Sequence, residues 1–151
     1  SFSRVLSEPL RAAGLGRKVM VAQFLKGGVN QGEKGIVRLC GNLEWLRPDI
    51  SCCLNKPFAE ESKESENSFF TTKAVEAVWQ ACKDRLLVGA IDQLVLDEIG
   101  LAIQLGYLKE EDLISTLKQR PEAIDVVLTG PSIPSRVMAM ADQITKLRCG
   151  F

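Results

Sequence analysis

The order of apolar and polar blocks along the chain predicts an α/β protein. The segment "RKVMVAQFLKGG" is an apolar run bounded by bases and a glycine pair, as expected for a strand buried on both faces, and "DQLVLDE" and "IDVVLTG" are further expected strands. Between the first two runs, residues 69–89 carry an apolar stripe with helical spacing, formed by Phe70, Ala74, Val75, Val78, Trp79, Cys82 and Leu86. Strands separated by helices indicate βαβ units and a parallel sheet.

We therefore expect a three-layer αβα fold around a mostly parallel sheet. The expected helices cover residues 6–16, 69–89, 109–121 and 134–143, and the expected strands cover residues 17–28, 42–48, 92–98, 124–130 and 144–148. In the first helix Ser7 would act as the N-cap, Pro9 would fit in the first turn, and Gly14 or Gly16 would end the helix. Residues 48–68 are polar and acidic with two prolines, and we expect a flexible loop there.

Composition is that of an ordinary globular domain. The 151 residues are 46% apolar and 25% charged, so we expect a single domain over residues 1–151. The net charge of zero gives no sign of a nucleic-acid partner. No apolar run approaches the length of a membrane span, and no signal peptide is visible, although the chain opens on Ser1. We expect a cytoplasmic protein.

The cysteines and the absence of histidine restrict the chemistry. Five cysteines occur without a C-x-x-C spacing, and there is no histidine, so we expect reduced thiols, no zinc and no haem. A redox role for the Cys52–Cys53 pair stays open. Without histidine, Ser-His-Asp and Cys-His catalysis are excluded.

Three strand ends carry candidate ligand-binding residues. Ligands of parallel sheets bind at the carboxyl ends of the strands. Lys26-Gly27-Gly28, Asp97-Glu98 and Thr129-Gly130 follow the first, third and fourth expected strands. Two acids after an apolar strand suit Mg²⁺ and a nucleotide phosphate. The alternative is structural: Asp97 caps the next helix, or the acids pair with a base, for which Lys26 is the best candidate.

A set of motifs in fixed order indicates a family. The segments "VAQFLKGGVNQGE", "LVLDEIGLAIQLGYLKEEDLISTLKQRPEAIDVVLTG" and "ADQITKLR" resemble the P-loop-type corrinoid adenosyltransferases, which transfer the adenosyl group of ATP to the cobalt of a reduced corrinoid. The resemblance implies Mg-ATP and a corrinoid as ligands, a homodimer, and a place in cobalamin biosynthesis. It assigns the metal side of the site to Asp97 and Glu98. It assigns the nucleotide side to Gln23, Lys26, Gly27, Glu33, Thr129 and Gly130.

The chain also departs from the family pattern where phosphate is bound. Aligned without gaps, the lysine and threonine of the family's phosphate loop fall on Ser1 and Phe2, which bring neither a cation nor a Mg²⁺ ligand. Pro131 stands where the family commonly has arginine, and Lys146 where it commonly has glutamate. Losing two charged hydrogen bonds at about 1.5–3 kcal/mol each would make ordinary ATP binding doubtful. The family's first strand would lie upstream of Ser1, and we expect an upstream segment or a partner chain to supply it.

Three functions follow from these observations. The first is a degenerate homologue that keeps the fold and has a binding or regulatory role. The second is an active ATP:cob(I)alamin adenosyltransferase with its phosphate loop upstream of this chain. The third is an interaction module of a larger protein, suggested by the missing strand and by Phe58 in the 48–68 loop.

Overall fold

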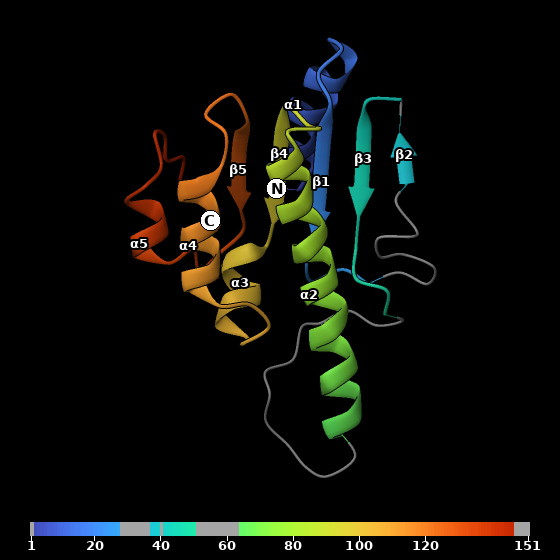
Figure 1. Cartoon of the computed structure of the whole chain (residues 1–151), viewed down its shortest axis with the longest axis vertical. Coiled ribbons are helices and arrows are strands. Elements are labelled where there is room, and N and C mark those ends of the chain that lie inside the picture. Colours follow the sequence, from blue (N-terminus) through green and yellow to red (C-terminus); the bar gives the residue numbers. More distant parts are fainter. Residues whose placement is uncertain (1, 28–36, 40, 51–63, 147–151) are drawn as a thin grey trace, which may run out of the picture.

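The sheet is mostly parallel and has five strands. The computed structural model describes residues 2–27, 37–39, 41–50 and 64–146. The strand order is β2-β3-β1-β4-β5 (Figure 1), with bounds Val37–Leu39 for β2, Leu43–Leu46 for β3, Val19–Gln23 for β1, Gln93–Asp97 for β4 and Asp125–Thr129 for β5. The last four of these are parallel, and β2 runs antiparallel to β3.

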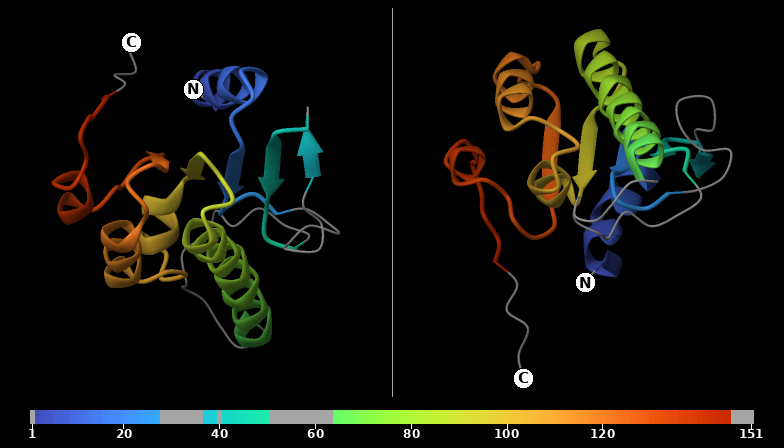
Figure 2. Two further views of the ribbon diagram at one scale, coloured as in Figure 1. Left: turned by 45° about the horizontal axis from the view of Figure 1, so that its top comes forward. Right: turned by 90° about the horizontal axis from the view of Figure 1, so that it is seen from below.

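Helices cover both faces of the sheet, which confirms the predicted αβα architecture. Figure 2 shows α1 (Phe2–Gly14) on one face, and α2 (Glu64–Val88), α3 (Ile99–Gln104) and α4 (Glu110–Gln119) on the other. The short α5 (Ser135–Met138) follows β5 and buries Val137 in the core on the α2 side. All parallel strands end at the lower edge in Figure 1, and α2 extends beyond the sheet there.

Alternation along the strands divides the apolar core into two clusters. On the α2 face, Met20, Ala22, Leu94 and Leu96 of the sheet pack in one cluster with the buried stripe of α2. On the α1 face, the cluster is smaller, and Ala12 and Ala13 are the buried members that α1 contributes. Strands β1 and β4 are buried along their whole length because helices cover both of their faces.

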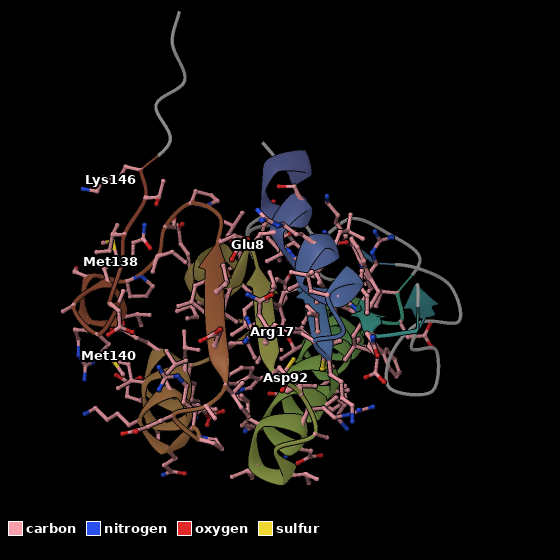
Figure 3. The ribbon with its side chains drawn as sticks, turned by 90° about the horizontal axis from the view of Figure 1, so that it is seen from above. Glu8, Arg17, Asp92, Met138, Met140 and Lys146 are labelled. Carbon is pink, nitrogen blue, oxygen red and sulfur yellow. The ribbon has the colours of Figure 1, made fainter. Side chains whose placement is uncertain are left out.

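The amino edge of the sheet is fixed by polar contacts. Arg17 Nη2 lies 2.7 Å from Asp125 Oδ2, and it donates a hydrogen bond of 3.3 Å to the carbonyl oxygen of Asp92. The Lys18 amide donates to Asp92 Oδ2 at 2.8 Å. Figure 3 looks onto this edge and shows Arg17 beside Asp92. These contacts join the starts of β1, β4 and β5. Because the register is the same along each strand, they also fix which residues lie side by side at the carboxyl ends.

Several predicted elements need correction. Helix α1 begins at Phe2, so Pro9 lies inside it, because the residues before Ser7 continue the helix instead of preceding a cap. Helix α2 begins at Glu64, so the last residues of the 48–68 segment are helical, and residues 51–63 lie outside the described part. Phe70 is 64% exposed and is not core, because this end of α2 extends beyond the sheet.

The two ends of the sheet also differ from the prediction. The final strand was predicted at residues 144–148, but residues 144–146 form no strand and are exposed, while 147 and 148 lie outside the described residues. Figure 3 shows Lys146 on the side of α5, away from the sheet. The sequence analysis missed β2, a short strand that forms a hairpin with β3. No helix in the described ranges is long and apolar enough to cross a membrane.

Gly100 allows α3 to pack directly on the chain after β5. A Cβ at this position would lie 2.6 Å from the carbonyl carbon of Ser132. We predict that Gly100→Ala lowers the free energy of unfolding by about 1–3 kcal/mol, the usual cost of overpacking. Gly14→Ala is the matched control, because a Cβ there meets nothing within 4 Å. Urea denaturation measures both, and equal stabilities would contradict the close packing.

Candidate functional site

A buried row of polar side chains crosses the carboxyl edge of three strands. Gln23, Asp97 and Thr129 end β1, β4 and β5, and the register places them side by side. Gln23 Nε2 donates a hydrogen bond of 2.8 Å to Asp97 Oδ2, and Thr129 Oγ1 donates one of 2.6 Å to Asp97 Oδ1. Gln23 is only 1% exposed and Asp97 only 6%. A protein donor therefore meets each carboxylate oxygen and offsets the cost of burying the charge.

The row continues into β3 through the other end of the Gln23 amide. Trp45 Nε1 and Arg47 Nε donate to Gln23 Oε1 at 3.0 and 2.9 Å. The guanidinium of Arg47 also lies over the Trp45 ring, 5.5 Å from its centroid. The amide of Gln23 is thus oriented from both sides, with its oxygen toward two N–H donors and its nitrogen toward the carboxylate. Four strands contribute to one network centred on Gln23 and Asp97.

Glu98 turns the chain from β4 into α3 with an uncommon backbone conformation. Its φ and ψ angles are 61° and 25°, in the left-handed region that residues with a Cβ rarely adopt. Its amide donates to the Thr129 carbonyl at 2.9 Å. Gly130 makes this approach possible, since a Cβ there would lie 2.8 Å from Glu98 Cα. The β5 strand end therefore helps to hold Glu98 in place.

Electrostatics at Glu98 favour its protonated form. Burial raises the pKa of Glu98, the neighbouring charge of Asp97 raises it further, and Lys26 lowers it. Glu98 is the N-cap residue of α3 but makes no side-chain cap hydrogen bond. The Asp97 carboxylate bonds to Gln23 and Thr129, so the hypothesis that Asp97 caps α3 finds no support in these contacts.

Most of the predicted site residues gather at this edge. Gln23, Asp97 and Thr129 are in direct contact, Glu98 and Gly130 adjoin them, and Lys26 and Gly27 follow β1 at the same edge. Phe2 begins α1, whereas Ser1 and Glu33 lie outside the described residues.

Sequence reasoning missed two residues of the network, Trp45 and Arg47. Both lie in the predicted segment 42–48, and a tryptophan and an arginine at the end of a parallel strand were the available signal.

A Mg²⁺ ion would find only part of its coordination shell here. The described residues contain no group of three or more cysteine, aspartate or glutamate side chains that could hold a metal. Both Asp97 oxygens already accept hydrogen bonds, although each retains a further lone pair. Mg²⁺ is usually held by one or two carboxylates together with water and substrate phosphates. Asp97 and Glu98 fit Mg²⁺ only in that manner, with phosphate and water completing the shell.

A concave surface lies away from the strand ends. A groove of about 710 Å³ runs between α2 and the turn before α4, and its lining includes Trp79, Lys83 and Asp112. Asp112 Oδ2 accepts hydrogen bonds from Trp79 Nε1 at 2.8 Å and from Lys83 Nζ at 3.0 Å. Because these charges satisfy one another and join α2 to α4, the contacts have a structural role, and the strand ends remain the better candidate site.

The hydroxyl of Thr129 is expected to stabilise the fold through Asp97. We predict that Thr129→Val lowers the free energy of unfolding by about 1.5–3 kcal/mol, because a hydrogen bond to a buried charge is lost without a change in shape. Thr129→Ser keeps the hydroxyl and is the matched control. Chemical denaturation at pH 7 measures the effect, and wild-type stability in the valine variant would rule out this bond.

The raised pKa of Glu98 makes a prediction with a definite sign. The folded-state pKa exceeds the unfolded value of 4.5, so the stabilisation linked to this group is complete below about pH 4.5 and is lost as pH rises through the folded-state pKa. Glu98→Gln should therefore be more stable than wild type at pH 7–8 and equally stable near pH 4. Denaturation midpoints in buffers with a metal chelator test this, and a pH-independent difference would contradict it.

The sequence is similar to known corrinoid adenosyltransferases over nearly its whole length. Residues 5–150 match the family described as ATP:corrinoid adenosyltransferase BtuR/CobO/CobP. The corrinoid adenosyltransferase CobA of Salmonella typhimurium is 33% identical over 139 residues, and the corrinoid adenosyltransferase of Escherichia coli K12 is 30% identical over 138 residues. Each comparison covers 91% of this chain and 65% of the relative.

An uncharacterized protein of Nostoc is 26% identical over 147 residues, which cover 92% of this chain and 38% of that protein. The chain thus spans about 65% of the length of its enzyme relatives from Salmonella and Escherichia coli. With a family match over residues 5–150 and an α/β sheet whose strand ends bring the motif residues together, this chain belongs to the corrinoid adenosyltransferase family.

Proposed function

We propose that this chain is a corrinoid adenosyltransferase homologue that binds nucleotide weakly and acts in binding or regulation instead of adenosyl transfer. One observation carries the proposal. Asp97 is almost fully buried, and its two carboxylate oxygens already accept hydrogen bonds from Gln23 and Thr129. A carboxylate satisfied in this way gains less from a hydrated Mg²⁺ than an exposed one, because the ion must compete with donors already in place.

The residues expected to meet the phosphates support the same proposal. In the ungapped comparison with the family pattern, Ser1 and Phe2 take the places of the lysine and threonine of the phosphate loop. Pro131, which follows Gly130 directly, is exposed and offers neither a charge nor an N–H donor. Under this comparison, a triphosphate would find fewer cationic contacts than the family pattern supplies.

An active ATP:corrinoid adenosyltransferase is the second candidate. It is favoured by the retention of Asp97 and Glu98 at the end of a central strand, in register with Gln23 and Thr129. Lys26, whose charge lowers the pKa of Glu98, lies on the same side of the site. In this case a phosphate loop outside the present sequence would supply the missing contacts, and Asp97 would hold Mg²⁺ through water.

Adenosyl transfer by the full natural polypeptide separates the two candidates. We expect no formation of a cobalt–carbon bond above the protein-free background when Mg-ATP and a chemically reduced corrinoid are added, as followed by visible absorbance. Equilibrium dialysis with the corrinoid alone should still detect binding, which is the part of the family role that the proposal retains.

Asp97→Asn is the matched control, because it keeps the shape of the side chain and removes its charge. Turnover in the wild type that disappears in Asp97→Asn would contradict the proposal and establish the active enzyme. Absence of both turnover and corrinoid binding would also contradict it, and would favour an interaction role.

A further inference from the structure

Arg47 is held in a fixed orientation at the strand-end site, and most of its donors have no partner among the described residues. Its Nε donates to Gln23 Oε1 at 2.9 Å, and its guanidinium lies 5.5 Å from the centroid of the Trp45 ring. Among the described residues these are the contacts of its side chain, so both terminal NH₂ groups, with four N–H donors, have no partner there. The side chain is nevertheless half-buried.

Three other arginines of the described chain, Arg17, Arg85 and Arg136, lie against carboxylates. Arg17 lies 2.7 Å from Asp125, and Arg85 lies 3.1 Å from Glu44. Arg47 has an amide oxygen and an aromatic ring in place of a carboxylate, so its charge is not neutralised by a direct partner in the described ranges. A half-buried guanidinium that is oriented by a buried network, and that reaches the Asp97 carboxylate only through the Gln23 amide, can still bind an anionic ligand directly.

The position of Arg47 places it on the candidate site. It follows β3 directly, and β3 is parallel to β1 and adjacent to it, so Arg47 lies at the carboxyl edge where Gln23 and Asp97 lie. The next residue is Pro48, which is buried and restricts the backbone of Arg47 to extended conformations. Lys26 follows β1 at the same edge. The site therefore has an oriented arginine after β3 and a lysine in the segment after β1.

We propose that Arg47 is the anion-binding residue of the strand-end site and that its ligand is a phosphate chain, as in a nucleoside triphosphate. The inference rests on the proposed function, since it names the residue that provides the weak nucleotide binding left without the family's phosphate-loop contacts. The two NH₂ groups of Arg47 form a planar fork that matches two phosphate oxygens. A chain of several phosphates offers this fork more oxygens and more negative charge than a single small anion does.

The proposed binding mode does not depend on a metal ion. The ligand contacts guanidinium N–H groups directly, whereas the Asp97 carboxylate is already bonded to Gln23 and Thr129. The ring of Trp45 lies against the guanidinium that would bind the ligand, so its fluorescence is a local reporter. Trp79, in α2, donates to Asp112 and packs on Phe24 instead of on the guanidinium of Arg47.

The test is a titration of sodium tripolyphosphate into the natural polypeptide without Mg²⁺, followed by calorimetry and by tryptophan fluorescence. We expect saturable binding that weakens with added salt, and a Kd that rises about 10- to 100-fold in Arg47→Gln, as for one lost charge-assisted interaction. Arg47→Lys keeps the charge without the fork and should lie between the two. Arg120→Gln is the matched control, because Arg120 is also a half-buried arginine but follows α4, far from the strand ends, and its Kd should stay within about twofold of wild type.

Each other result would overturn the inference. No saturable binding in the wild type, or the same Kd in Arg47→Gln as in the wild type, would show that Arg47 is not an anion site. Equal binding of citrate would overturn the assignment to phosphate. If Arg47→Gln does not fold, Arg47→Lys replaces it, and wild-type affinity in that variant would show that the fork is not used. This titration contains neither corrinoid nor Mg-ATP. A negative result here therefore does not determine the result of the adenosylation and dialysis experiments, which test the proposed function separately.

Discussion

A carboxylate buried at the end of a central strand needs hydrogen-bond donors, and the parallel register of this sheet supplies them. Asp97 lies level with Gln23 on one side and Thr129 on the other, and both donate to its oxygens. The same register requires the chain to turn sharply at Glu98, which adopts a left-handed conformation against Gly130. The positions of α3 and of the loop after β5 therefore depend on how the Asp97 charge is satisfied.

This interaction also bears on function. A strand end with two adjacent acids is suited to metal and nucleotide chemistry, but here the buried acid is bonded within the protein, and burial raises the pKa of the half-buried Glu98. The proposed function further assumes that Ser1, Phe2 and Pro131 take the places of the family's phosphate contacts, as the ungapped comparison of the sequence predicts. A site of this kind agrees with the proposal that the chain keeps the family fold but binds phosphate weakly. In the described part of the site, the terminal NH₂ groups of Arg47 are donors without a protein partner.

Much of the fold could be predicted from the sequence, because the buried parallel strands are continuous apolar runs and α2 has a clear apolar stripe. The failures have physical causes. The strand predicted at residues 144–148 is not formed by residues 144–146, because sheet pairing is a long-range property that the local sequence does not reveal. Strand β2 is only three residues long and gains its stability from pairing with β3. The side chain of Phe70 fits the helical stripe but extends past the sheet that would cover it. The sequence was enough to predict that Asp97, Glu98 and Thr129 lie at the carboxyl ends of parallel strands. The hydrogen bonds from Trp45 and Arg47 to Gln23 could not be predicted without knowing that β3 lies next to β1.

Calorimetric titration of ATP, with and without Mg²⁺, into the wild type and Asp97→Asn tests most directly whether the strand-end carboxylate serves the protein or a nucleotide. The account predicts weak binding, with a Kd well above the micromolar range, that Mg²⁺ does not strengthen and that the folded asparagine variant retains. A micromolar Kd that requires Mg²⁺ and is lost in Asp97→Asn would contradict it, because Asp97 would then be a metal-side residue of a working nucleotide site.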